Sequence, residues 1–108
     1  MASEITAKRI AIDRLRMELM TAKTLKETWF VYLLRCADDS LYTGIAKDVS
    51  RRCEQHNAGT ASHYTRSRLP VAVVYQEPQA SRSLALKREA AIKALSRRKK
   101  EKLIFSVS

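Results

Sequence analysis

The chain has 108 residues, which suffice for one domain with a modest core and are too few for two. Apolar residues make up 45% of it, a content that excludes disorder throughout. Its 21 Lys and Arg against 11 Asp and Glu leave a formal net charge of +10. We therefore favour nucleic acid as the partner over a charge that only aids solubility, although charge alone does not separate DNA from RNA.

Cysteine usage and hydropathy exclude further classes. Cys36 and Cys53 are the only cysteines and lie in no CxxC or Cys/His spacing, so we expect neither a disulfide nor a zinc site. No apolar run approaches the roughly 20 residues that cross a bilayer, and no signal peptide is evident. The sequence thus predicts a cytoplasmic protein without membrane contact.

Residues 1–27 are predicted to form an amphipathic helix, an extension that precedes a domain at 28–108. Its apolar residues Ile5, Ile12, Leu15 and Leu19 follow one another at helical spacings. Three roles stay open for it: packing on the domain, dimerisation or another protein contact, or a loose extension upstream of an alternative start at Met20.

A β-hairpin is predicted next. Residues 28–36 are rich in β-branched and aromatic types, and a similar run resumes at 41–46. The turn between them decides whether Tyr32 and Tyr42 share a face of the sheet. A two-residue turn would place them on opposite faces.

A three-residue loop has the other outcome. If the loop is Ala37-Asp38-Asp39, with Asp39 in the left-handed conformation, both tyrosines lie on one face and Tyr32 stands opposite Gly44. Gly44 would then leave space for the phenol ring.

The remaining elements are helices around one more strand. Asp48 can cap a helix that runs to about Asn57, with Gly59 at its C-terminal cap. Residues 60–69 are a polar, basic loop, and a strand at 71–75 follows Pro70 and ends before Pro78. This strand is either parallel to its neighbour or reached by a crossover.

Two further helices complete an α+β fold in which a small three-stranded sheet is flanked by helices. Ser81 or Ser83 can cap a helix to about Leu95, and Ser96 can cap a short one to about Phe105.

The helix after Asp48 has an unusual inner stripe. Val49, Arg52, Cys53 and His56 lie on one side of it, so Arg52 and His56 lean toward the sheet. A buried arginine needs an anion or a carboxylate partner. The alternative is that Arg52 extends along the helix edge and that His56 is an ordinary helix-end cation.

A carboxylate has a similar place on a later helix, where Ala85, Glu89 and Ile92 share a stripe. Glu89 can form a surface pair with Lys93 four residues on. An inward Glu89 that faces a cationic helix instead suits a phosphate-cleaving site, which needs a hard oxygen ligand for Mg²⁺ and donors for phosphoryl charge.

The tyrosines alone indicate only packing with hydroxyls at the rim. A free phenol has a pKa of about 10 and is a poor base at pH 7. As a proton acceptor, Tyr32 would need the cationic groups of Arg52 and His56, or an ion on Glu89, nearby.

Together these residues resemble the GIY-YIG endonuclease superfamily, from about Trp29 to Ile104. The likeness is carried, in chain order, by Phe30-Val31-Tyr32, Tyr42-Thr43-Gly44, Arg52, His56 and Glu89. Phe30 stands in place of the first glycine of GIY, and Thr43 stands in place of the isoleucine of YIG. Residues 42–56, YTGIAKDVSRRCEQH, resemble the second motif and its following helix throughout. Within the superfamily the chain resembles the small, single-domain YhbQ-like bacterial branch.

The resemblance implies that the two tyrosines, Arg52, His56 and Glu89 converge on one face, and we expect them in one solvent-open concavity. It implies Tyr32 as the general base for water and Glu89 as the sole protein ligand of one Mg²⁺ or Mn²⁺ ion. Arg52 would bind the scissile phosphate. Tyr42 and His56 would orient water, metal or the phenol.

Two basic segments extend the predicted nucleic-acid contact. The first comprises Tyr64, Thr65, Arg66 and Arg68, on the loop before the third strand. The second is the run Arg97, Arg98, Lys99 and Lys100, whose cations at a helix N-terminus call for an anion nearby. A solvated charge run is the other interpretation of the second segment.

The sequence thus predicts a Mg²⁺-dependent endonuclease, with DNA favoured over RNA and branched, nicked or damaged structures as candidate substrates. A non-catalytic nucleic-acid or ribosome-associated binding module on the same fold is the alternative. A third interpretation is a subunit whose basic face meets an acidic protein.

Overall fold

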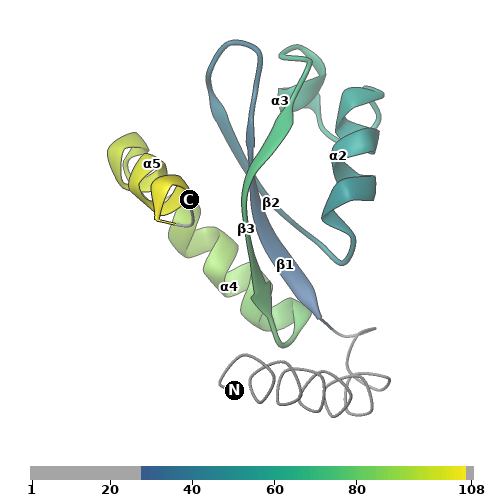
Figure 1. The fold of residues 1–108 in the computed structure, drawn as a ribbon. Helices are drawn as coiled ribbons and strands as arrows, with labels where there is room; N and C mark the ends of the chain where they lie inside the picture. The colour runs from purple at the N-terminus through teal and green to yellow at the C-terminus, as the bar shows by residue number, and fades with distance from the viewer. Residues whose placement is uncertain (1–27, 107–108) are drawn as a thin grey trace, which may run out of the picture.

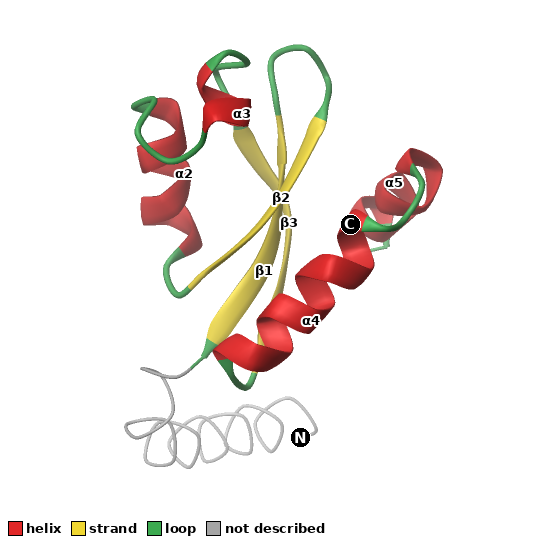
Figure 2. Ribbon diagram, turned by 180° about the vertical axis from the view of Figure 1, so that it is seen from behind, coloured by secondary structure: helices red, strands yellow, loops and turns green. Residues whose placement is uncertain are grey.

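The computed structural model describes residues 28–106, and the expected N-terminal helix lies outside these residues. The elements are β1 (Trp29–Arg35), β2 (Leu41–Ala46), α2 (Val49–Asn57), α3 (His63–Arg66), β3 (Ala72–Gln79), α4 (Arg82–Lys93) and α5 (Arg97–Phe105). Figures 1 and 2 show α2 and α3 on one side of the sheet and α4 and α5 on the other. The expected α+β class is confirmed.

The sheet has the order β2-β1-β3, and both outer strands are antiparallel to β1. The chain therefore crosses over β1 between β2 and β3, which is the second of the two connections left open by the sequence. β3 also continues past its expected end, because Pro78 pairs with Phe30. A proline is tolerated there since β3 is an edge strand.

The hairpin loop is the three-residue one. The Cys36 amide donates to the Ser40 carbonyl over 2.9 Å, and Asp39 has a φ of 68°. Tyr32 consequently pairs with Gly44. This register puts Tyr32 and Tyr42 on the same face of the sheet, because side chains of a strand alternate between its faces.

The alternation along β1 creates two apolar clusters, one on each face. Tyr32 and Leu34 pack toward α2, together with Cys36, Ala46, Val49 and Val71. Val31 and Leu33 pack against Ala85 and Ile92 of α4. Both cysteines are free thiols. The side of the sheet that α2 covers is therefore the side on which the two tyrosines lie.

The expected caps of α2, α4 and α5 are present, with Asp48, Ser81 and Ser96 accepting backbone amide hydrogen bonds. Helix α3 was not expected from the sequence. Its single turn is too short for a periodic pattern, and the signal it offered was Ser62, which accepts from the Tyr64 amide.

Gly44 allows the close approach of Tyr32. A Cβ at Gly44 would lie 2.5 Å from the Tyr32 hydroxyl oxygen. We expect Gly44→Ala to lower the free energy of unfolding by about 1–3 kcal/mol, because the buried ring must shift. Denaturant unfolding measures this loss.

A double-mutant cycle with Tyr32→Leu separates the clash from a general loss of strand stability. The cost of Gly44→Ala should fall sharply once the aromatic ring is gone. An equal cost in both backgrounds would contradict the steric explanation.

Candidate active site

Tyr32 and His56 form a buried pair at the centre of the face that α2 covers. The Tyr32 hydroxyl oxygen lies 2.9 Å from Nε2 of His56, and the two residues are 1% and 0% exposed. His56 is on the inner side of α2, as the helical stripe predicted. The pair therefore holds a phenol and an imidazole in hydrogen-bond contact away from bulk water.

The other ring nitrogen of His56 contacts Thr65 of α3. Nδ1 lies 2.7 Å from the Thr65 hydroxyl oxygen, which in turn lies 3.4 Å from the Ser62 carbonyl oxygen. A carbonyl only accepts, so the Thr65 hydroxyl donates to Ser62 and accepts from Nδ1–H. His56 thereby presents a bare Nε2, and Tyr32 is the donor to it.

Thr65 is consequently not a nucleic-acid contact, contrary to the expectation from the sequence. Its side chain is fully buried, at 0% exposure, because α3 turns it inward toward His56. The contact of Thr65 with His56 could not be predicted from a local sequence signal, because it forms only when α3 folds back onto α2.

Both groups of the pair are neutral near pH 7. The pKa of Tyr32 is raised to about 12, mainly by burial and then by Tyr42 and Glu89, while Arg52 acts in the opposite direction. Burial, followed by the nearby Arg52 charge, lowers the pKa of His56. Proton transfer from Tyr32 to His56 is thus unfavourable until a bound group changes these charges.

Tyr42 links the pair to the surface. Its ring centroid lies 4.9 Å from that of His56 and 6.3 Å from that of Tyr32. On the other side it stacks on the exposed ring of Tyr64, at 6.1 Å and an interplanar angle of 29°. The Arg68 guanidinium lies 3.9 Å from the centre of the Tyr64 ring. Tyr42 thus continues the buried aromatic cluster outward.

Arg52 has an unused hydrogen-bond donor. Its Nη1 donates to Gln55 over 3.0 Å, whereas its buried Nε has no hydrogen-bond partner among the residues that the structure describes. An unmet buried donor costs about 1–3 kcal/mol. The same guanidinium acts on both Tyr32 and His56. A phosphate oxygen is the kind of partner that would satisfy it.

Glu89 comes from α4, which packs on the opposite face of the sheet. Its side chain is 18% exposed and its Oε1 lies 3.7 Å from Nζ of Lys93, so the surface pair considered from the sequence is present. Among the effects that shift the pKa of Tyr32, that of the Glu89 charge is the smallest. Its neighbours Ala85 and Ile92 pack against the other apolar cluster, whereas the Glu89 charge acts on Tyr32. That Glu89 converges with the other four residues stays a prediction.

The expectation of a solvent-open concavity also needs correction. Tyr32 and His56 are sealed by the packing of α2 and α3, and only Tyr42, Arg52 and Glu89 are partly exposed. The structure therefore brings the phenol, imidazole and guanidinium together, with the carboxylate within electrostatic range from the other layer.

Among the candidate site residues, the Glu89 carboxylate is the group that could hold a divalent ion. In the part of the chain that the structure describes, no three His, Cys, Asp or Glu gather into a metal-binding group. Mg²⁺ commonly takes one or two carboxylates and completes its shell with water and substrate phosphate. The partly exposed Glu89 carboxylate would supply one such ligand, and in this structure it pairs with the Lys93 ammonium.

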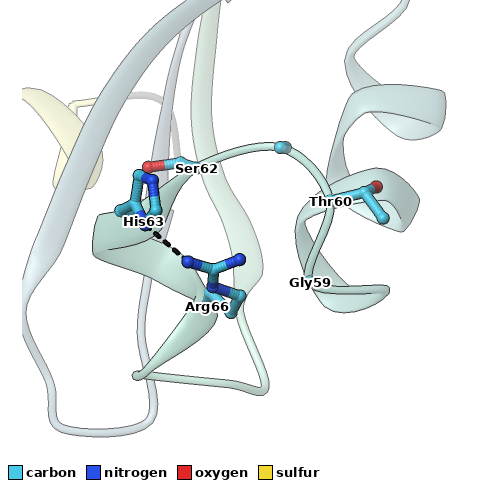
Figure 3. A pocket seen from close by; sticks show the side chains of 6 residues that line it. Gly59, Thr60, Ser62, His63 and Arg66 are labelled. Carbon is cyan, nitrogen blue, oxygen red and sulfur yellow. Dashed lines mark hydrogen bonds between the residues drawn. The ribbon is translucent and has the colours of Figure 1, made fainter.

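The first basic segment surrounds a shallow hollow beside α3. It has a volume of about 180 Å³ and is lined by Gly59, Thr60, Ala61, Ser62, His63 and Arg66. Figure 3 shows Arg66 on this hollow, hydrogen-bonded to His63. Arg68 lies farther along and pairs with Asp38 over 3.0 Å. Arg66 is therefore the more available cation of the two.

The second basic segment forms the first turn of α5, and this turn contains no acidic residue. Arg97 donates to the side chain and carbonyl of Asp39 at the hairpin turn. Arg98 and Lys99 are exposed, and neither forms an ion pair within residues 28–106. The unpaired cations of this turn remain candidates for phosphate contacts.

Thr65→Val should expose the structural role of this residue. Removing the hydroxyl leaves the buried Nδ1–H of His56 unpaired, so we expect the free energy of unfolding to fall by about 1–3 kcal/mol. Thr65→Ser keeps the hydroxyl and should retain more of the stability. Imidazole ¹⁵N shifts should show the Nδ1–H tautomer in the parent, and an Nε2–H tautomer there would contradict the assignment.

Comparisons with known proteins agree with this architecture. The GIY-YIG catalytic domain family matches residues 28–102. A UPF0213 protein of Staphylococcus aureus is 53% identical over 78 residues, which are 72% of this chain and 95% of that protein. The expected similarity to the YhbQ-like branch is confirmed by these relatives.

Two solved structures are also similar. A protein from E. faecalis shares 37% identity, with a TM-score of 0.52 over 75% of this chain and 86% of that one. A UPF0213 protein from Bacillus halodurans shares 43% identity, with a TM-score of 0.47 over 71% and 82%.

Within the described residues, no helix has the length and apolar character to span a membrane.

Proposed function

We propose, because the chain belongs to the GIY-YIG catalytic domain family, that it is a Mg²⁺-dependent endonuclease that hydrolyses DNA phosphodiester bonds. Members of this family are in general nucleases. The metal dependence and a preference for branched, nicked or damaged DNA are part of the proposal. DNA is favoured over RNA as the partner.

The observation that carries the proposal is the unmet donor of Arg52 beside the Tyr32–His56 pair. A guanidinium whose buried Nε has no partner in the described part of the chain is positioned to bind an anion, and it is the cation that lowers the Tyr32 pKa. One phosphate bound there would satisfy the donor and stand next to the phenol. Binding of the substrate and activation of the base would then use the same residue.

Each residue has a role in one-step hydrolysis. Tyr32 accepts a proton from the attacking water after passing its own to Nε2 of His56, and Arg52 stabilises charge on the phosphoryl oxygens. Tyr42 orients the phenol and the imidazole through ring contacts. Glu89 would hold the divalent ion, which when bound supplies Lewis-acid polarisation and offsets the carboxylate charge.

The burial of the pair favours the second candidate function, a binding module without catalysis. Tyr32 is only 1% exposed, so its hydroxyl reaches water only when neighbouring side chains shift. A chain that kept the fold and lost catalysis would still retain the basic residues of α3 and α5.

A panel of labelled single-stranded, duplex, nicked, flap and branched DNA, with matched RNA, tests the proposal. Each is incubated with the protein in Mg²⁺ or in chelator. We expect Mg²⁺-dependent cuts in DNA, with branched or nicked forms cut faster than plain duplex. Binding to the panel without any metal-dependent cut would favour the binding module.

Binding should weaken steeply with salt, because cations that neutralise phosphates release counterions. We expect Arg66→Ala with Arg68→Ala to flatten the slope of log affinity against log salt by about one to two units. The ion pair of Arg68 with Asp38 favours the lower value.

Arg82→Ala is the matched control, since Arg82 begins α4 and lies over the Trp29 ring. It should leave the salt slope close to that of the parent. An unchanged slope in the double variant would contradict a phosphate contact at this segment.

A further inference from the structure

A second hollow lies where the hairpin, α3, α4 and α5 meet. It has a volume of about 240 Å³ and is lined by Leu41, Tyr42, Thr43, Tyr64, Lys93 and Lys100. Its ionisable lining consists of two ammonium groups and two phenols, and it contains no carboxylate. This lining suits an anion, and the 240 Å³ accommodate a phosphate with part of a sugar.

Tyr42 connects this hollow to the proposed active site. The same ring that lines the hollow lies 4.9 Å from the His56 ring. A nucleic-acid strand that placed one phosphate at Arg52 would therefore bring a neighbouring part of its backbone to the hollow. The lysines there are not needed for any step of the chemistry described above.

Lys93 belongs both to this hollow and to Glu89. Its ammonium lies 3.7 Å from Glu89 Oε1, a long ion pair, and its side chain is 55% exposed. A single flexible ammonium cannot remain against the carboxylate when a divalent cation binds there, because the two cations repel. Lys93 also lines the hollow, so its ammonium has an alternative position there, next to a bound anion.

We propose that the hollow lined by Tyr42, Tyr64, Lys93 and Lys100 binds a backbone phosphate next to the scissile one, and that Lys93 exchanges between Glu89 and this phosphate. The proposal rests on the proposed function of Glu89 as metal ligand. When the divalent ion occupies the carboxylate, Lys93 is released to the phosphate, and a bound phosphate in turn draws Lys93 from the carboxylate.

Metal and nucleic acid therefore favour each other's binding. This coupling is reciprocal. The ion raises the affinity for nucleic acid by the same factor by which nucleic acid raises the affinity for the ion. The protein without nucleic acid would hold its divalent ion weakly, since Lys93 competes for the carboxylate.

The test compares Lys93→Met with Lys87→Met. Lys87 is an exposed lysine on the same helix that does not line the hollow. A short fluorescent DNA oligonucleotide is the probe, in a Tyr32→Phe background that prevents cutting. Anisotropy gives its affinity with Mg²⁺ and with chelator, at one ionic strength, since salt screens these charges. NMR shifts of α4 amides give the affinity for Mg²⁺ alone.

In chelator, Glu89 holds Lys93 for part of the time, so we expect Lys93→Met to weaken oligonucleotide binding only slightly more than Lys87→Met. In Mg²⁺, Lys93→Met should weaken it about two- to fivefold more than Lys87→Met, and without DNA it should bind Mg²⁺ about two- to fivefold more tightly than the parent. Equal losses with and without Mg²⁺, or unchanged Mg²⁺ affinity, would overturn the exchange.

These results are distinguishable from a failure of the proposed function. If the coupling is present and the protein with Tyr32 intact cuts nothing, the hollow and its exchange stand and the nuclease assignment fails. If cutting depends on Glu89 and the effect of Lys93→Met is the same in Mg²⁺ and in chelator, the nuclease assignment stands and the exchange fails.

Discussion

Glu89→Ala is expected to reduce Mg²⁺-dependent cleavage by at least about 10²–10³-fold while leaving the fold intact. The change removes the one proposed protein ligand of the ion, and losses of this order accompany removal of a single group that stabilises transition-state charge. Folding should be preserved because the side chain is partly exposed and forms only a long ion pair with Lys93.

Nucleic-acid affinity in chelator should be retained or improved in this variant, since a carboxylate near phosphate is repulsive when no metal is bound. Glu54→Ala is the control, because Glu54 is an exposed glutamate on α2 and should cut like the parent. Circular dichroism and denaturant unfolding check the fold of both. Parent-like cleavage by Glu89→Ala would show that the metal-site assignment is wrong.

Arg52→Met is expected to separate stability from activity. Cleavage should fall by about 10²–10³-fold, because the guanidinium acts on the phosphate and on Tyr32. The free energy of unfolding should be unchanged or higher by about 1 kcal/mol, because the lost Nη1 hydrogen bond to Gln55 is offset by removal of a buried Nε that has no partner among residues 28–106. Methionine also keeps the apolar stem. A gain in stability with a loss of function is typical of a site residue.

Arg51→Met provides the matched control for this variant. Arg51 precedes Arg52 on α2 but is exposed, so its replacement should change neither stability nor cleavage by much. Nucleic-acid binding, measured in chelator, should weaken more for Arg52→Met than for Arg51→Met. A strongly destabilised Arg52→Met would contradict the view that this side chain is held for its ligand and not for the core.

Much of the fold follows from local signals in the sequence. Asp48, Ser81 and Ser96 cap their helices as expected, because each side-chain oxygen meets a free backbone amide of the first turn. The left-handed Asp39 selects the three-residue loop, and this loop sets the faces of both tyrosines.

The misses are long-range contacts. Thr65 was assigned to the surface because a polar loop usually lies in water, and its burial depends on α3 folding onto α2. Glu89 is partly exposed and lies at a helical spacing from the buried Ala85 and Ile92 of α4. The sequence pattern did not show which face of the sheet that helix covers, because periodicity gives the buried side of a helix but not its layer.

The pairing of Tyr32 with His56 was anticipated only in part. The helical stripe predicted that His56 leans toward the sheet, and the loop predicted the face of Tyr32. Their burial results from the packing of α2 and α3, and neither the helical stripe nor the hairpin loop predicts it. Both residues can therefore be identified from the sequence, whereas the depth of their burial cannot.

The most direct test is cleavage of the best DNA substrate from the panel by chelator-treated protein, before and after Mg²⁺ is added back. We predict no cut in chelator, and cleavage by the parent but not by Glu89→Ala once Mg²⁺ returns. Cutting in chelator, or binding without cutting in either condition, would contradict a metal-dependent nuclease.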